Sequence, residues 1–191
     1  MIVEHLHGLG RHLVQARGIA RRYAIVNGFD GALTMLGLLS GFLLSEDVTP
    51  QIVIGACVGA AVALGVSGVT SAYLSEAAER RRALAELEAA MVTDLGDSDP
   101  GRAARLLPWI VALVNGGSPV LLSCIIISPL WLAEAGIALP FDALSIAISV
   151  ALACIFVLGL FLGQIAGSSW LLNGVKALLV ALLTMLIIHL L

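Results

Sequence analysis

The stretch YAIVNGFDGALTMLGLLSGFLL, residues 23–44, decides the fold of this protein. Its only acid is Asp30, and it contains no Lys, Arg or His among its mostly apolar residues. About 20 apolar residues in a helix cross a bilayer core of about 30 Å. The stretch therefore predicts a membrane-spanning helix with one carboxylate inside it.

Four further apolar stretches are also long enough to cross a bilayer, and they cover residues 51–74, 107–133, 141–164 and 169–191. Over the 191 residues, 60% are hydrophobic and 12% are charged, whereas soluble domains carry about 25% charged residues. This composition excludes a soluble domain, a nucleic-acid-binding module and a disulfide-stapled secreted domain. The predicted fold class is all-α: a polytopic membrane protein with five transmembrane helices and a short cytoplasmic helix between helices two and three.

The ten Lys and Arg residues fall on one side of this predicted bundle: Arg11, Arg17, Arg21, Arg22, Arg80, Arg81, Arg82, Arg102, Arg105 and Lys176. The loops on the other side carry acids alone: Glu46, Asp47, Glu134 and Asp142. Because Lys and Arg in short loops stay in the cytoplasm, we expect a multi-pass cell-membrane protein with a cytoplasmic N-terminus and its C-terminus outside.

The chain divides into one membrane domain with polar additions. Residues 1–22 show apolar residues at helical spacing opposite arginines, which predicts an amphipathic cytoplasmic helix lying on the membrane. Residues 23–74 contain transmembrane helices one and two, and residues 107–191 contain helices three to five. The polar segment 75–106 between them predicts a helix from Ser75 to about Leu95, too small to form a core of its own.

Asp30 is the leading candidate for a functional residue. An ionisable group inside a span costs at least about 2.5–3.5 kcal/mol on insertion scales, so such groups are functional candidates by default. Asn27, Thr34 and Met35 lie near it at helical spacing and add oxygen and thioether ligands. The four residues predict a divalent-metal or proton site. The alternative is an aspartate that only fixes the packing of a neighbouring helix.

The third span contains a second polar segment, Asn115-Gly116-Gly117-Ser118-Pro119. Pro119 lacks a backbone donor and the glycines weaken the helix, so we expect broken backbone here, with Asn115 and Ser118 lining a cavity. The runs 24–28 and 112–116, AIVNG and ALVNG, also match at four of five positions. This match indicates a duplicated two-helix unit, although a match this short also arises by chance in apolar sequence.

The chain resembles the vacuolar iron transporter family along its whole length. The residues that carry the resemblance are Val26-Asn27-Gly28-Phe29-Asp30-Gly31 and Tyr73-Leu74-Ser75, followed by a charged helix. The resemblance implies a homodimer that exchanges iron or manganese (Fe²⁺ or Mn²⁺) for protons, with no permanently bound cofactor. Asp30 matches the aspartate of the family's first span.

The sequence also departs from the family's pattern. Ala60, Gly68 and Ala72 stand where the family commonly has a glutamate, a methionine and the glutamate of a Gly-Glu-Tyr motif. The cytoplasmic glutamate-rich region is reduced, and its candidate remnants for metal contact are Glu76, Glu79 and Glu86. The alternative for these three glutamates is an ordinary solvated helix face.

Three functions follow from these residues. The first is a proton-coupled divalent-cation transporter that uses Asp30, with membrane lipids and a second copy of the chain as its partners and no enzymatic activity. The second is a binding or scaffold protein of the same fold that has lost its metal ligands. The third is a lipid enzyme, since Asp30-Gly31 superficially resembles the start of a motif of phosphatidyl-alcohol transferases. The further acids of that motif are missing from the first two spans.

Overall fold

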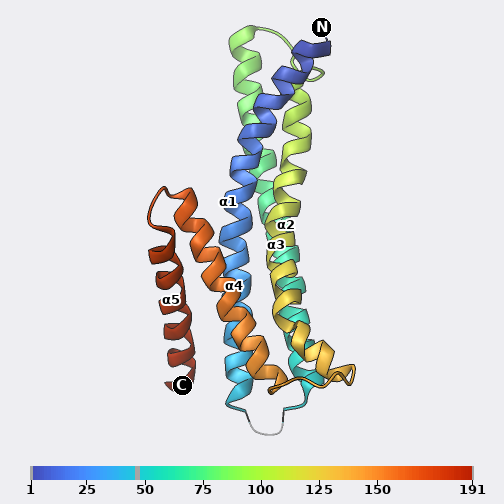
Figure 1. Ribbon diagram of the computed structural model, residues 1–191. Helices are drawn as coiled ribbons and strands as arrows, with labels where there is room; N and C mark the ends of the chain where they lie inside the picture. The colour runs from blue at the N-terminus through green and yellow to red at the C-terminus, as the bar shows by residue number, and fades with distance from the viewer. Residues whose placement is uncertain (1, 46–47, 191) are drawn as a thin grey trace. The chain divides into compact units, whose positions relative to one another are not determined.

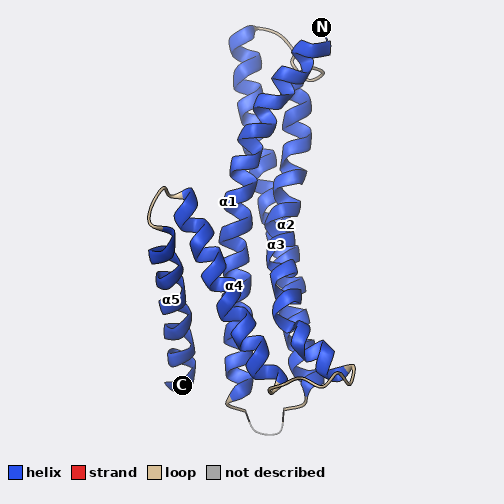
Figure 2. Cartoon of the chain, viewed as in Figure 1, coloured by secondary structure: helices blue, strands red, loops and turns tan. Residues whose placement is uncertain are grey.

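The computed structural model describes the backbone of residues 2–45 and 48–190, and the side chains from residue 18 onward within those ranges. The described residues form five α-helices joined by loops (Figure 1, Figure 2). The helices are α1 (Ile2–Leu43), α2 (Pro50–Met91), α3 (Asp99–Glu134), α4 (Ala143–Ile165) and α5 (Trp170–Leu190). Each helix contains a stretch long and apolar enough to cross a membrane, which confirms the all-α fold and the five expected apolar helices.

The helices fall into a short pair, α4 and α5, and three longer helices, of which α3 contains 36 residues. α4 and α5 contain 23 and 21 residues, which at 1.5 Å per residue is about 30–35 Å, the length of one membrane crossing. α1 and α2 contain 42 residues each, or about 63 Å, and therefore continue beyond the bilayer core.

In four of these helices an aromatic residue lies about one membrane crossing from one end. Tyr23, Tyr73, Trp109 and Trp170 each lie 21 to 26 residues from the opposite end of their helix, counted along the chain. Helices of that length span about 31–39 Å, which fits a bilayer core plus its interface. Tyr and Trp are enriched at this interface because their rings are amphipathic.

The short cytoplasmic helix predicted between spans two and three is not an element of its own, although the helical conformation predicted from Ser75 is present as far as Met91. Its residues are the end of α2, which runs without interruption from Pro50 to Met91, and α3 begins after a loop at Asp99. Residues 75–91 contain neither Gly nor Pro and are rich in Ala, Glu and Arg, so nothing stops the helix where it leaves the span. In the same way, the predicted amphipathic segment 1–22 is continuous with the first span in α1, and the side chains of residues 1–17 lie outside the described ones.

The chain divides into two compact units. The three-helix unit comprises Met1–Ala24 and Val66–Gly117, and the five-helix unit comprises Ile25–Gly65 and Ser118–Leu191. The three-helix unit brings together the beginning of α1, the end of α2 and the beginning of α3, and nine of the ten cationic residues belong to it.

The core of the five-helix unit draws residues from all five helices. Its fully buried members include Met35, Leu36, Leu39, Cys57, Ile126, Ala147, Ile155 and Ala181. In lipid, such contacts hold helices together through close van der Waals packing, because the surrounding acyl chains are equally apolar.

Glycines allow the closest approaches in this unit. A Cβ on Gly159 of α4 would lie 2.8 Å from the carbonyl oxygen of Asn173 and 2.9 Å from the Cα of Gly174 in α5. α4 and α5 accordingly lie side by side in Figure 1. α1 meets α3 in the same manner, since a Cβ on Gly31 would lie 2.7 Å from the Cβ and 2.8 Å from the Cα of Pro119.

The expected break of the backbone in the third span is also wrong. α3 is helical through residues 115–119, although Pro119 cannot donate to the carbonyl of Asn115. Neighbouring helices stabilise a proline-containing span where they pack against it. Here Gly28 and Gly31 of α1 lie against Ser118 and Pro119.

The contact between Gly31 and Pro119 predicts that Gly31→Ala destabilises the protein. The added methyl group meets backbone and ring atoms that cannot move freely, and overpacking of this kind costs about 1–3 kcal/mol. Gly41→Ala on the same helix is the control, because no atom lies within 4 Å of its added Cβ. Titration with dodecyl sulfate in detergent gives the free energy of unfolding of both variants. Equal values for Gly31→Ala and Gly41→Ala would contradict the packing of Gly31 against Pro119.

Candidate functional site

Asp30 lies on the exposed face of α1. Arg22, Val26 and Asp30 follow one another at intervals of four residues, and all three are exposed. Residues four apart lie on the same side of a helix. The adjacent Gly31 and Ala32 are buried, so the Asp30 side chain points away from the core of the five-helix unit.

The Asp30 carboxylate has no hydrogen-bond or ion-pair partner among the residues that the structure describes. Its main-chain carbonyl accepts a hydrogen bond of 2.8 Å from the Thr34 hydroxyl, one turn further along α1. Lys176 of α5 is exposed and forms no ion pair with Asp30. The carboxylate is therefore not tied to a neighbouring helix within the described part of the chain.

Asp30 also lies well inside Gly18–Leu43, the part of α1 that is long and apolar enough to cross a membrane. It is seven residues beyond Tyr23, which is about 10 Å along the helix axis. An ionised carboxylate facing acyl chains is expensive, and intramembrane acids almost always face a bundle interior or a water-filled cavity. The exposed face of α1 around Asp30 is consequently a surface that requires water or another protein surface.

The structure separates the four residues predicted to form the metal or proton site. Asn27 and Thr34 are half-buried and lie within about 60° of Asp30 around the helix, at about 100° per residue. Met35 is about 140° away from Asp30 by the same count, and its side chain is completely buried in the apolar core. Asn27, Asp30 and Thr34 share one side of α1, whereas Met35 is a core residue.

Asn115 joins α3 to α2 inside the three-helix unit. Its side-chain Nδ2 donates a hydrogen bond of 2.8 Å to the main-chain carbonyl of Gly68, and both residues are buried. A Cβ on Gly68 would lie 2.9 Å from the Cα of Gly116, so a methionine at position 68 would meet the backbone of α3. Asn115 is thus placed at a helix–helix contact.

Ser118 has a packing role in the five-helix unit. Its hydroxyl oxygen would lie 2.8 Å from a Cβ on Gly28 of α1. Both candidates for cavity-lining residues, Asn115 and Ser118, therefore lie where glycine brings two helices close together.

The three candidate glutamates, Glu76, Glu79 and Glu86, lie in the charged C-terminal part of α2. Arg80 pairs with Glu76 at 3.4 Å, Arg82 pairs with Glu86 at 2.9 Å, and Glu79 is exposed. Both pairs link residues four apart on one helix. Within the described ranges, no group of three or more His, Cys, Asp and Glu residues is arranged to hold a metal ion.

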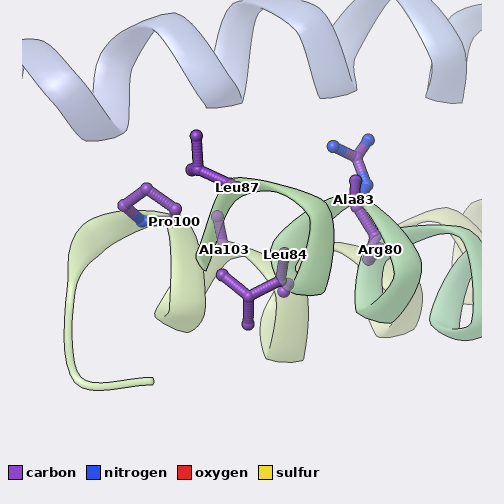
Figure 3. Close-up of a pocket in the computed structure, with 7 residues that line it drawn as sticks. Arg80, Ala83, Leu84, Leu87, Pro100 and Ala103 are labelled. Atoms are coloured by element: carbon purple, nitrogen blue, oxygen red, sulfur yellow. The ribbon is translucent and has the colours of Figure 1, made fainter. Parts of the chain in front are cut away.

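A cavity of about 140 Å³ lies between α2 and α3 in the three-helix unit (Figure 3). It is lined by Arg80, Ala83, Leu84, Leu87, Pro100, Ala103 and Ala104. Figure 3 shows Arg80 and Leu87 extending to the same side of α2. The walls are mainly apolar, and the one cationic side chain among them already pairs with Glu76.

Comparison with known proteins finds one similar chain without a known role. The protein is 29% identical over 173 residues to an uncharacterized protein of Methanocaldococcus jannaschii, MJ0645, with 87% of each chain covered. No protein-family model matches the chain, and no solved structure matches it.

The exposed side of α1 that carries Arg22, Val26 and Asp30 was not predicted, although the four-residue spacing of these residues is visible in the sequence. The pairing of Asn115 with Gly68, which lie 47 residues apart, was not predicted either, and no local pattern indicates that contact.

The bond between Asn115 and Gly68 predicts a measurable loss of stability in Asn115→Ala. Hydrogen bonds between membrane helices contribute about 0.6 kcal/mol on average and up to about 1.7 kcal/mol. Gln164→Ala removes an exposed amide at the end of α4 and is the matched control. Dodecyl sulfate titration again provides the free energy of unfolding, and an unchanged value for Asn115→Ala would show that the bond contributes nothing.

Proposed function

We propose that the protein is a transporter that exchanges a divalent cation, Fe²⁺ or Mn²⁺, for protons across the membrane, with Asp30 as cation ligand and proton acceptor. The observation that carries this proposal is an exposed carboxylate at membrane depth without a partner among the described residues. A purely structural aspartate would bond a neighbouring helix instead. The resemblance to vacuolar iron transporters supports the same function.

The chemistry of the Asp30 side of α1 suits a hard cation. Asp30 contributes a carboxylate, and Asn27 and Thr34 on the same side of α1 carry an amide and a hydroxyl. Ions such as Mn²⁺ bind oxygen ligands of these kinds. Met35 is not part of this set, because it is buried in the core.

One copy of the chain supplies too few ligands to replace the hydration shell of a divalent ion. We propose that a second copy covers the exposed face of α1, so that two Asp30 side chains flank the cation in a homodimer. This arrangement removes the carboxylates from lipid and doubles the number of oxygen ligands.

Proton exchange follows from the ligand chemistry. A carboxyl group must lose its proton to bind a metal ion. Binding of the cation therefore releases a proton, and release of the cation allows the carboxylate to take one up again. The arginine distribution supports a cytoplasmic N-terminus and a C-terminus outside.

Asp30→Asn is predicted to abolish uptake of Mn²⁺ into proteoliposomes, because the amide can neither exchange a proton nor neutralise the cation. Quenching of an entrapped calcium-indicator dye by Mn²⁺ measures uptake, and an entrapped pH dye measures the countermoving protons. Asp142→Asn is the matched control, since Asp142 caps α4 by accepting from the backbone nitrogen of Ser145 and asparagine caps a helix equally well.

Three outcomes decide this proposal. Loss of uptake in Asp30→Asn with normal uptake in Asp142→Asn supports it. Equal uptake in both variants and the unchanged protein contradicts a role for Asp30. No Mn²⁺ uptake or binding by the unchanged protein contradicts transport and favours a binding or scaffold protein of this fold.

The dimer is tested separately with cysteines. After Cys57, Cys124 and Cys154 are replaced by alanine, Asp30→Cys is predicted to form disulfide-linked dimers under mild oxidation in membranes. Val157→Cys, exposed on α4, is the control and is predicted to remain monomeric on a denaturing gel. Monomeric Asp30→Cys would show that the two α1 faces do not meet.

A further inference from the structure

The exposed side of α3 changes from basic to aromatic to aliphatic along one line. Arg102, Arg105, Trp109 and Leu113 follow at spacings of three, four and four residues, and all four are exposed. These spacings place them on one face of the helix. This order of side chains, basic then aromatic then aliphatic, follows the order of water, lipid headgroups and acyl chains across one side of a bilayer.

A second aromatic residue packs beside Trp109. The rings of Trp109 and Tyr73 of α2 lie 4.3 Å apart, centre to centre, within the three-helix unit. Tyr and Trp rings concentrate at the level of the lipid headgroups. Arg105 is one turn from Trp109 and Arg102 is two turns away, which is about 6 Å and 10 Å along the helix.

α1 repeats the pattern at its own entry to the membrane. Arg21 and Arg22 are exposed and directly precede Tyr23, and Val26 is exposed one turn later. Thus two helices of the three-helix unit carry exposed arginines within about two turns of an interfacial aromatic residue.

These arginines are not neutralised by acids. No residue that the structure describes forms an ion pair with the four arginines Arg21, Arg22, Arg102 and Arg105. On α2, by contrast, Arg80 pairs with Glu76 and Arg82 pairs with Glu86. Arg21, Arg22 and Arg105 lie within about one turn of an aromatic residue. Arg81 of α2 is also exposed without an ion pair among the described residues, but it lies eight residues beyond Tyr73.

We propose that Arg102 and Arg105, together with Arg21 and Arg22, bind the phosphate groups of anionic membrane lipids. A guanidinium group fits a phosphate with two parallel hydrogen bonds and retains its charge at all relevant pH values. The neighbouring Trp109 and Leu113 contact the glycerol and acyl regions of the same lipid. Soluble anions lack this apolar part and do not match the whole line.

Trp109 itself reports the lipid that occupies this line. Trp131 and Trp170 are 39% and 53% exposed, so phenylalanine replaces them with little loss of packing and leaves Trp109 as the sole tryptophan. The protein is reconstituted into vesicles that contain either brominated phosphatidylglycerol or brominated phosphatidylcholine, and the bromine atoms quench Trp109 on contact. Stronger quenching by the phosphatidylglycerol at equal mole fraction is expected.

Arg102→Gln with Arg105→Gln is expected to remove most of this preference. A juxtamembrane arginine contributes an affinity for anionic lipid of about five-fold, so each substitution reduces the preference by about that factor. Lysine at both positions retains the charge and is expected to retain most of the preference. Arg82→Gln is the matched control, because Arg82 pairs with Glu86 and lies nine residues beyond Tyr73.

Equal quenching by the two lipids in the single-tryptophan protein would overturn the proposal. An undiminished preference in the doubly substituted protein would overturn it as well. Circular dichroism checks that the helices are intact, and Arg102→Gln and Arg105→Gln are measured singly if the double variant fails to fold. Inorganic phosphate added to phosphatidylcholine vesicles is expected to leave Trp109 unchanged, and a change would show that the site takes free phosphate instead of lipid.

Discussion

The constraint on which this structure depends is the cost of holding a carboxylate on the outer face of a membrane helix. Asp30 lies about 10 Å beyond Tyr23 and points away from an apolar core that includes Met35 and Leu36. Acyl chains do not solvate such a group, so the side of α1 that carries it requires water, a cation or a second protein surface. The proposed transport site, its second copy and its proton exchange all follow from this one requirement.

Glycines hold the helix that carries Asp30 in place. The residues directly around the acid, Gly28 and Gly31, are those that bring α1 against Ser118 and Pro119 of α3. Two rigid backbones in contact leave α1 little freedom to rotate, and a rotation is what would bury Asp30 in the core. Glycines also bring α3 close to α2 just before Pro119. There Gly68 lies against Gly116, and the Gly68 carbonyl accepts a hydrogen bond from the Asn115 side chain.

The sequence predicts those features that depend on length and hydropathy. Five apolar stretches became five helices long and apolar enough to cross a membrane, because about 20 residues per crossing is a strict requirement. It failed at Pro119, where α3 stays helical because neighbouring helices pack against it. It also counted the helical residues after Ser75 apart from the second span, although no residue between them and Met91 ends α2. The sequence pattern also grouped Met35 with Asp30. A separation of five residues places the two side chains on different sides of a helix, and the Met35 side chain is buried in the core.

The most direct test of the central claim is the infrared spectrum of the protein in lipid while Mn²⁺ is added. The account predicts that the carbonyl band of a protonated carboxylic acid disappears on binding, that a carboxylate band replaces it, and that this change is missing in Asp30→Asn. A spectrum that is unaffected by Mn²⁺, or one that changes equally in Asp30→Asn, would contradict the claim that Asp30 exchanges a proton for a cation.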